Sequence, residues 1–453
     1  MPSIQFGLSS YERAEGNLPE LPVINMMAEE APTEDRGVML QSRPGLDDRS
    51  ADMGAGPVKQ LFRRDLVLSS ALFGVSDNKL YSGTTNLGAI DGTGAASIAG
   101  NEIGIMVTQG ASLYFYNGTT LAAVTFPDSA NVAHVSQGGS RFWLCRADTG
   151  KLYFTDALES DVEALDFLTA ESFPDRLFMT LWIDGMLIAF GKESIEFFQQ
   201  TGSATLPLKA LQNMVIEEGV KGVNCAAPVG ETFAAISSKN RVIYGFQAQV
   251  ISNKGLHEKI EASSTHSCFT FLLGGDEYFA VRLDSETQCW NRRTGMWSEF
   301  QTLGLTNWAA QCYADGVFGS AEDGKTLQWG SDYTDALATS SVLERRFRGG
   351  FVLNGGGIDV NNVQLRGNVG NTSYLVTPYD DPTVEMRVSR DAARTWGNWK
   401  GRSWGKQGEY RQKVQWRGCG LASYPGFVAE FRMTDPVGFR ISDVLLNESY
   451  GGR

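Results

Sequence analysis

The chain has 453 residues, of which 42% are hydrophobic and 11% aromatic, so it is not broadly disordered and two or three folded domains are expected. Its 39 Lys and Arg residues are outnumbered by 52 Asp and Glu residues, which gives a formal net charge of −13 at pH 7. This charge argues against a protein that grips nucleic acid over its whole surface, and against docking on anionic lipid.

The N-terminus, MPSIQFGLSS, has no basic segment followed by an apolar stretch. No signal peptide is therefore predicted, and we expect synthesis in a cytosol without export. Six cysteines are scattered without a CxxC motif, which is sparse for a disulfide scaffold. Most of them lie in apolar runs, which favours buried free thiols.

Residues 1–60 differ from the rest of the chain. They contain acidic and proline-bearing stretches, with little of the alternation that is typical of strands. We predict an extended N-terminal arm that lies on other elements or on a neighbouring subunit.

Residues 61–338 are predicted to form a β-propeller of six or seven blades. Apolar runs alternate with turn pairs such as Asp-Asn, Asn-Gly and Asp-Gly, a pattern that indicates successive hairpins. Groups of hairpins begin near residues 69, 102, 132, 178, 223, 266 and 307, so most of the spacings lie between 41 and 46 residues. Such a period, with several strands in each unit, is typical of propeller blades.

Residues 339–453 have a different character and predict a C-terminal β-sandwich. Positions 341–453 carry 16 Lys and Arg against 11 Asp and Glu, a net charge of +5, which leaves −18 for the first 340 residues. Strand patterns continue here: Phe431 and Met433 alternate with Arg432 and Thr434, as expected for a strand with one buried face. The fold class predicted for the whole chain is all-β.

Gly319–Thr326 formally matches a phosphate-binding loop of the Walker A type. That chemistry needs a strand before the loop and a helix after it, so that the helix N-terminus faces the phosphates. Here both flanks, GVFG and TLQWG, are strand-like, and Asp323-Gly324 is a typical hairpin turn pair. The context favours a propeller hairpin over a nucleotide site.

A second motif resembles the Asp-box of sialidase propellers, S-x-D-x-G-x-T-W. It comprises Ser389, Asp391, Thr395 and Trp396, with Ala393 at the usual glycine position. In that motif the Asp caps a turn and the Trp packs beneath the hairpin, so a structural role is expected. A carbohydrate-binding or carbohydrate-cleaving propeller is the alternative function, but a single degenerate copy gives it little support.

Other candidates for chemistry are weak. The three histidines, His134, His257 and His266, are isolated, and His266 with Cys268 on one strand face favours core packing. No catalytic residue, cofactor site or metal site is predicted. The basic and aromatic cluster from Trp396 to Arg417 could bind single-stranded nucleic acid or a sugar polymer. We favour buried tryptophans with solvated basic residues, part of which face an acidic neighbouring protein.

Characteristic runs lie near both ends of the chain. The N-terminal ones are PVINMMAE (22–29), GVMLQSRPGL (37–46), GPV (56–58) with LF (61–62), and LFGVS (72–76) with LY (80–81). The C-terminal ones are RTW (394–396) with Trp399, GEY (408–410), VQW (414–416) and FRMTDPV (431–437). With these runs the chain resembles the packaged-DNA stabilisation proteins of short-tailed phages.

The resemblance implies a structural tail hub, also called a nozzle, and not an enzyme. Such proteins form rings, typically of six, beneath the portal–adaptor assembly. They hold a tail needle or other plug, carry fibres or spikes, help to retain packaged DNA and form the channel for its ejection without binding it specifically. The implied location is the virion tail, after synthesis in the host bacterial cytoplasm. A propeller scaffold of host signalling is disfavoured because GH…WD repeats are missing.

Two sets of residues are predicted to serve this role. The subunit or adaptor interface is assigned to Asn25, Glu29, Arg43, Pro44, Arg345, Arg346, Arg402 and Lys406. An acidic channel wall would repel DNA within a screening length of about 8 Å. The residues predicted to line it are Glu159, Asp161, Glu163, Glu217 and Glu218.

Overall fold

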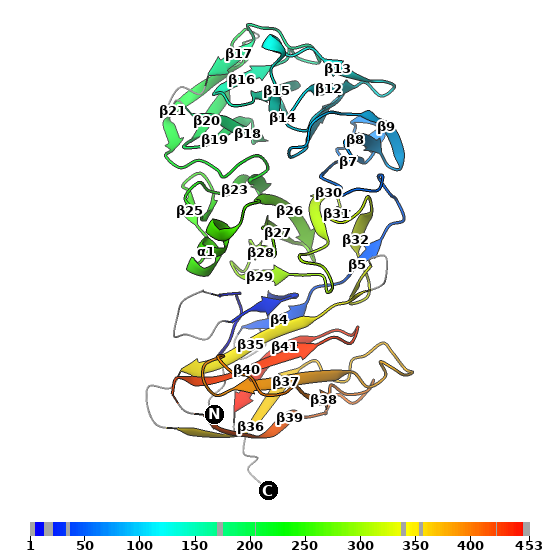
Figure 1. Cartoon of the computed structure of the whole chain (residues 1–453), viewed down its shortest axis with the longest axis vertical. Coiled ribbons are helices and arrows are strands. Elements are labelled where there is room, and N and C mark those ends of the chain that lie inside the picture. The colour runs from blue at the N-terminus through cyan, green and yellow to red at the C-terminus, as the bar shows by residue number, and fades with distance from the viewer. Residues whose placement is uncertain are drawn as a thin grey trace.

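The computed structural model describes residues 5–12, 21–32, 37–169, 175–203, 205–336, 341–352, 357–422 and 424–446. Within these ranges the regular elements are strands, apart from helix α1 (Lys254–Ala262) and two short 3-10 turns (Leu68–Ser70 and Pro127–Ser129). The all-β prediction is thus confirmed. No helix among the described residues is both long and apolar enough to cross a membrane. A propeller forms one end of the molecule and a sandwich the other (Figure 1).

Among the described residues, seven four-stranded antiparallel units make up the propeller, and they are numbered here in chain order. Unit 1 contains β6 (Gln60–Phe62), β7 (Phe73–Ser76), β8 (Lys79–Ser82) and β9 (Thr85–Ala89). Unit 2 contains β10 (Ser97–Asn101), β11 (Gly104–Thr108), β12 (Leu113–Tyr116) and β13 (Leu121–Val124). Unit 3 contains β14 (Val132–Gly138), β15 (Arg141–Arg146), β16 (Lys151–Phe154) and β17 (Phe167–Thr169). Unit 4 contains β18 (Leu177–Ile183), β19 (Met186–Gly191), β20 (Ile195–Gln200) and β21 (Leu208–Ile216).

The remaining units complete a closed ring. Unit 5 contains β22 (Ala226–Val229), β23 (Thr232–Ile236), β24 (Val242–Tyr244) and β25 (Gln249–Val250), and α1 follows it. Unit 6 contains β26 (Ser267–Leu273), β27 (Asp276–Arg282), β28 (Thr287–Asn291) and β29 (Trp297–Phe300). Unit 7 contains β30 (Ala310–Ala314), β31 (Val317–Ser320), β32 (Thr326–Trp329) and β5 (Leu46–Asp48). The first strand of each unit contacts that of the next, and β30 contacts β6, so the last unit meets the first.

Closure of the ring uses a strand from the N-terminal part of the chain. β5 pairs with β32 and supplies the outer strand of unit 7, beside which it lies in Figure 1. The sequence places the first two units too late, near residues 69 and 102. The first strand of unit 1, β6, has only three residues, which is too short to show an alternating pattern.

The sandwich packs two sheets face to face. One contains β3 (Met26–Glu30), β4 (Val38–Ser42), β41 (Arg440–Leu446), β36 (Ile358–Gly367) and β39 (Val414–Ala422). The other contains β2 (Val23–Ile24), β35 (Arg345–Val352), β40 (Gly426–Met433), β37 (Thr383–Ser389) and β38 (Lys400–Ser403), and β1 (Gln5–Phe6) also pairs with β35. Aromatic side chains fill the space between them, with Phe347 stacked on Phe431 at 5.0 Å and Trp416 5.7 Å from Phe431. The C-terminal β-sandwich prediction is confirmed.

The two bodies share one sheet. β2 runs parallel to β29 of unit 6 and antiparallel to β35 of the sandwich, so that Ile24 faces Glu299 on one side and Arg346 on the other. A ten-stranded sheet therefore continues from unit 6 into the sandwich. The propeller and sandwich are joined by backbone hydrogen bonds as well as by side chains.

The described part of residues 1–60 lies on other elements of the chain, as was expected of the N-terminal arm, and it does so as paired strands. Its strands β2, β3 and β4 are built into the sandwich, and β5 closes the propeller. The physical reason is that buried backbone N–H and C=O groups at a sheet edge are costly when they are unpaired, and these strands provide their hydrogen-bond partners. The remaining short pair, β33 (Thr334–Asp335) with β34 (Ser341–Val342), links unit 7 to the sandwich.

Candidate functional site: the junction between propeller and sandwich

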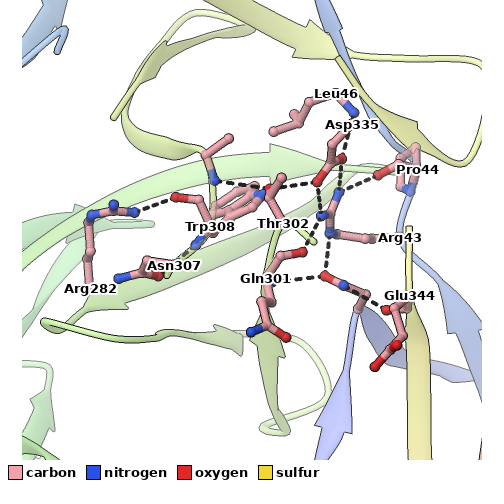
Figure 2. Close-up of polar contacts among 12 residues, drawn as sticks. Arg43, Pro44, Leu46, Arg282, Gln301, Thr302, Asn307, Trp308, Asp335 and Glu344 are labelled. Atoms are coloured by element: carbon pink, nitrogen blue, oxygen red, sulfur yellow. Dashed lines mark hydrogen bonds and ion pairs between the residues drawn. The ribbon is translucent and has the colours of Figure 1, made fainter. Parts of the chain in front are cut away.

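A buried ion pair lies where the N-terminal strands, unit 7 and the sandwich meet. Arg43, directly after β4, donates from Nη1 to Asp335 Oδ1 at 2.9 Å and from Nη2 to Oδ2 at 2.7 Å. The side chains of Arg43 and Asp335 are 0% and 1% exposed. Figure 2 shows the two groups in this fork-to-fork arrangement, which is the strongest geometry for an arginine–carboxylate pair.

Every donor of the Arg43 guanidinium is used. Nε donates to Asn25 Oδ1 at 2.8 Å, and the remaining donors reach the carbonyls of Pro44 at 2.9 Å and Gln301 at 3.0 Å. The group also lies 5.5 Å from the Phe300 ring centroid and 5.7 Å from that of Trp308. A buried charge is tolerated only when it is paired and hydrogen-bonded in this way.

Asn25 connects the propeller to the sandwich. Its Oδ1 also accepts from the Gln301 backbone N at 3.0 Å, and its Nδ2 donates to Glu344 O at 2.8 Å. Gln301 follows the last strand of unit 6, and Glu344 precedes β35. Asn25 has a φ of 53°, a left-handed conformation that Asn tolerates better than most residues.

The Asp335 carboxylate is saturated as well. It accepts from the Leu46 backbone N at 3.1 Å and from Thr302 Oγ1 at 2.7 Å (Figure 2). The chain at Gly45 passes so close that a Cβ there would lie 1.9 Å from Thr334 O, which requires glycine. The arrangement fixes β5 and β33 against each other. Its chemistry is structural, because no donor or acceptor of the pair is left for a ligand.

A second buried arginine lies on the sandwich side of the junction. Arg345 donates to the carbonyls of Met433 at 3.3 Å and Val437 at 2.6 Å, and also to that of Asp435. Burial lowers the pKa of its guanidinium to about 9. The acceptors of these hydrogen bonds are carbonyl oxygens, which carry only partial negative charge. The bonds attach β35 to the end of β40.

Three predicted interface residues, Asn25, Arg43 and Arg345, are buried and bonded within the chain. Their assignment to the subunit or adaptor interface is corrected, because their polar groups are already bonded within the chain. The sequence motif that contains Asn25 and Arg43 was noticed, but its partners Gln301, Thr302 and Asp335 were missed. The one sequence feature that could have indicated these partners is that they are polar residues beside strand-like runs.

The other predicted interface residues reach the surface to different degrees. Glu29 and Pro44 line a pocket of about 300 Å³ between the N-terminal strands and unit 6. Arg346 is half-buried, and its Nε lies 3.9 Å from carboxylate oxygens of Glu344 and Glu430. Arg402 and Lys406 are exposed on the sandwich edge.

The residues predicted to line the channel are also partly exposed and partly buried. Glu159, Asp161 and Glu163 are exposed in the loop between β16 and β17, and Glu217 is exposed after β21. Glu218 is 4% exposed and pairs with Arg241, so its assignment to an open channel wall is corrected. Burial would raise the pKa of Glu218, but hydrogen bonds from Arg241 and Ser237 outweigh it and lower the pKa.

The Asp-box residues form a turn at the end of β37. Asp391 accepts from the Thr395 backbone N at 2.9 Å and from Thr395 Oγ1 at 2.6 Å, while Ser389 Oγ donates to it at 2.7 Å. These bonds, that from Thr395 Oγ1 foremost, lower the pKa of Asp391 to about 2. The guanidinium of Arg387 lies over the Trp396 ring, with Cζ 4.6 Å from the ring centroid.

The Walker-like segment lies in a turn, and the cysteines and His134 considered as reactive groups are buried in the core. The Walker-like segment connects β31 to β32, with no helix after it. Burial raises the pKa of the Cys145, Cys225 and Cys312 thiols to about 12 and lowers that of His134 to about 3, so these groups stay neutral near pH 7.

One group of three carboxylates was missed from sequence. Oxygens of Glu12, Glu286 and Glu299 lie within 4.8 Å of one another. Lys259 Nζ lies 2.6 Å from Glu12 Oε2 and 2.8 Å from Glu286 Oε2, and it supplies the positive charge that this group needs. The cluster holds the N-terminal segment on α1.

Comparison with known families identifies both bodies. The family model described as bacteriophage P22 Gp10, β-propeller, matches residues 3–268, and the model described as bacteriophage P22 Gp10, β-sandwich, matches residues 344–447. The chain belongs to the phage P22 Gp10 family. Its membership confirms the predicted resemblance to tail hub proteins of short-tailed phages, and with it a structural protein rather than an enzyme.

A curated relative is the tail hub protein gp10 of Salmonella phage P22, 26% identical over 234 residues. The aligned region is 48% of this chain and 48% of that protein, so the match spans about half of the relative. Similar solved structures include the β-propeller domain of Myceliophteria thermophila Cps50 (Swd1), with 11% identity, a TM-score of 0.41, and 63% of this chain and 100% of that chain covered. Another is BamB from Moraxella catarrhalis, with 12% identity, a TM-score of 0.34, and 68% and 94% covered.

The junction draws on both regions that define this family. Asn25 and Arg43 lie in the segment matched by the propeller model, although Asn25 donates to Glu344 O at the start of the sandwich. Arg345 lies in the segment matched by the sandwich model. The Gp10-type chain is therefore held together by residues from its two ends.

Proposed function

We propose that this chain is a hub subunit of a phage tail, which docks beneath the portal–adaptor assembly, helps to retain packaged DNA and forms the channel for genome ejection. The observation that carries the proposal is the match of both bodies, propeller and sandwich, to the P22 Gp10 family. A structural role in the tail agrees with the shared ten-stranded sheet and the Arg43–Asp335 pair, which hold the propeller and the sandwich in one arrangement.

The proposed assembly is a homo-oligomeric ring, most simply of six subunits, made in the host bacterial cytoplasm and incorporated into the virion tail. Ring contacts are heterologous, so each subunit offers two different surfaces and closure depends on their angle. Portal–adaptor proteins, a tail needle or plug, and fibres or spikes are the proposed partners. Among the predicted interface residues, Glu29, Pro44, Arg346, Arg402 and Lys406 are accessible enough to contact them.

The charge distribution supports a channel that does not hold DNA. The first 340 residues carry a net charge of −18, and the exposed carboxylates of Glu159, Asp161, Glu163 and Glu217 belong to them. A basic wall would bind phosphates and release counterions, which would oppose ejection. We propose that acidic propeller residues face the channel and that the basic sandwich faces protein partners.

A gene deletion tests the retention role. Particles that lack the chain should package DNA and then lose it, and adding the purified chain to freshly filled capsids should restore retention. DNA retention at the normal level in particles without the chain would overturn the proposal. The Asp-box gives no support to the sialidase-like alternative, because the Asp391 carboxylate accepts its hydrogen bonds from Thr395 within the same turn.

A further inference from the structure

Three carboxylates from distant parts of the chain converge beside helix α1. Glu12 lies in the N-terminal segment, Glu286 lies between β27 and β28, and Glu299 lies within β29. One oxygen from each of them lies within 4.8 Å of the other two. The backbone at Glu12 is held tightly against α1, since a Cβ on Gly255 would lie 1.6 Å from Glu12 O. The folded chain therefore sets the spacing of the three carboxylates.

Glu299 is the member of this group that lacks a partner. The residue is 8% exposed, and among the described residues its carboxylate has no hydrogen-bond or ion-pair partner. Burial first, and then the negative charge of Glu286, raise the pKa of Glu299 to about 7. A buried carboxylate is costly unless it is paired. The Glu299 carboxylate, which faces Glu12 and Glu286, is thus suited to accept a cation.

Lys259 shows where a cation is held between the other two carboxylates. Its Nζ lies 2.6 Å from Glu12 Oε2 and 2.8 Å from Glu286 Oε2, whereas no ion pair joins it to Glu299 in the described part of the chain. The Lys259 side chain is 24% exposed and belongs to the last turn of α1. Because a lysine side chain is long and flexible, rotation about its own bonds can carry the ammonium into water.

A cavity of the size of an ion adjoins this ammonium. It has a volume of about 10 Å³, and Glu12, Lys259, Gln288 and Trp297 are among the residues that line it. Gln288 is directly opposite Glu299 in the ladder between β28 and β29. A cavity of this volume holds about one water molecule, so it suits a single ion and excludes an organic ligand.

The chemistry of these ligands favours calcium. Ca²⁺ takes carboxylate oxygens at about 2.3–2.6 Å, so two oxygens on one ion lie up to about 5 Å apart, and it accepts irregular geometry. Mg²⁺ demands a nearly ideal octahedron and usually keeps several waters beside one or two carboxylates. Structural zinc sites use cysteine and histidine, and neither is in this group.

We propose that Glu12, Glu286 and Glu299 form a calcium site, in which the ion takes the place of the Lys259 ammonium and water completes the coordination. The inference goes beyond the proposed function, because it needs only the folded chain. The N-terminal segment also pairs with the sandwich through β1 and β35. Bound calcium would therefore tie a segment of the sandwich to α1 and β29 of the propeller.

Calorimetric titration of calcium into the full chain, freed of metal with a chelator, tests the proposal at about pH 8, above the pKa of Glu299. Calcium should bind and raise the thermal midpoint relative to the chelator, and magnesium should do so less. Glu299→Gln should weaken calcium binding by about tenfold or more. Glu261→Gln, which removes an exposed carboxylate of α1, is the matched control and should leave the affinity unchanged.

Lys259→Gln tests the exchange of cations separately. Because it removes the competing ammonium, it should strengthen calcium binding by about tenfold, although it destabilises the metal-free chain. A purely structural lysine would not change the calcium affinity in this direction.

No calcium binding by the wild-type chain would overturn the site. Equal affinities in Glu299→Gln and Glu261→Gln would also overturn it, because the ion would then bind elsewhere on this acidic chain. Unchanged or weaker binding by Lys259→Gln would contradict the replacement of the ammonium. Thermal unfolding of each variant in the chelator separates loss of the site from loss of the fold, and none of these results depends on incorporation into a tail.

Discussion

Lys325, directly before β32, pairs with Asp48 of the neighbouring strand β5, with Nζ 3.2 Å from Oδ2. The lysine that would be the phosphate-binding residue of a Walker loop thus pairs with the N-terminal strand that closes the propeller. Its side chain is 23% exposed and that of Asp48 is 29% exposed. The pair is a closure contact at the surface, which is worth little on its own.

Replacing Lys325 with Ala should therefore leave function intact. We expect the free energy of unfolding to fall by less than about 1 kcal/mol, as for other exposed ion pairs. Particle assembly and infection should stay at the wild-type level. ATP hydrolysis by the pure chain that disappears in Lys325→Ala would contradict the hairpin interpretation.

Breaking the Arg43–Asp335 pair should be far more damaging. Arg43→Ala leaves a buried carboxylate without its partner, and a loss of about 3–5 kcal/mol is expected from denaturant unfolding. Asp335→Ala should cost a similar amount, and the double variant less than the sum of the two, by about 0.5–3 kcal/mol. The exposed Arg176–Asp148 pair is the control, because Arg176→Ala should cost less than about 1 kcal/mol. Additive effects at Arg43 and Asp335 would argue against a coupled pair.

The Asp-box turn carries removable backbone strain. Ala392 and Ala393 have φ values of 56° and 72°, a left-handed conformation that costs alanine about 1–2 kcal/mol. Ala393→Gly should raise the thermal midpoint of the sandwich, after part of the gain is offset by the larger entropy of glycine in the unfolded chain. A lower midpoint would show that Ala393 makes contacts worth more than the strain.

Stability should depend on pH through Glu299, which is 8% exposed. Burial first, then Glu286 and Glu12, raise its pKa to about 7, while Lys259 and Arg346 oppose the shift. The folded chain therefore binds a proton that the unfolded chain has lost above about pH 4.5, so this contribution is present at low pH and is lost as the pH rises towards 7. At about 1.36 kcal/mol per pKa unit it amounts to at most about 3.5 kcal/mol. Glu299→Gln, which stays neutral, should flatten the dependence between pH 5 and pH 7, and an unchanged slope would contradict it.

Features of the fold and of the site could be predicted from sequence where the contacting residues are close together in the chain. Hairpins such as β31–β32 are local, and the Asp323-Gly324 turn between uncharged strand-like runs was sufficient to predict one. The Arg43–Asp335 pair joins positions 292 residues apart, so no local pattern indicates it. The same holds for β5, whose partner β32 lies at the other end of the propeller sequence. Helix α1 was not predicted, although Asn253 is a typical N-cap and accepts from Leu256 N.

Imaging of the intact particle tests the central claim most directly. A cryo-electron microscopy reconstruction of the purified phage tail should contain a ring of this chain beneath the portal–adaptor assembly, with propeller and sandwich in the arrangement of Figure 1 around a DNA-wide channel. The account predicts exposed acidic propeller residues on the channel wall and the basic sandwich against neighbouring proteins. A tail reconstruction without this chain, or one in which Lys and Arg dominate the channel wall, would contradict it.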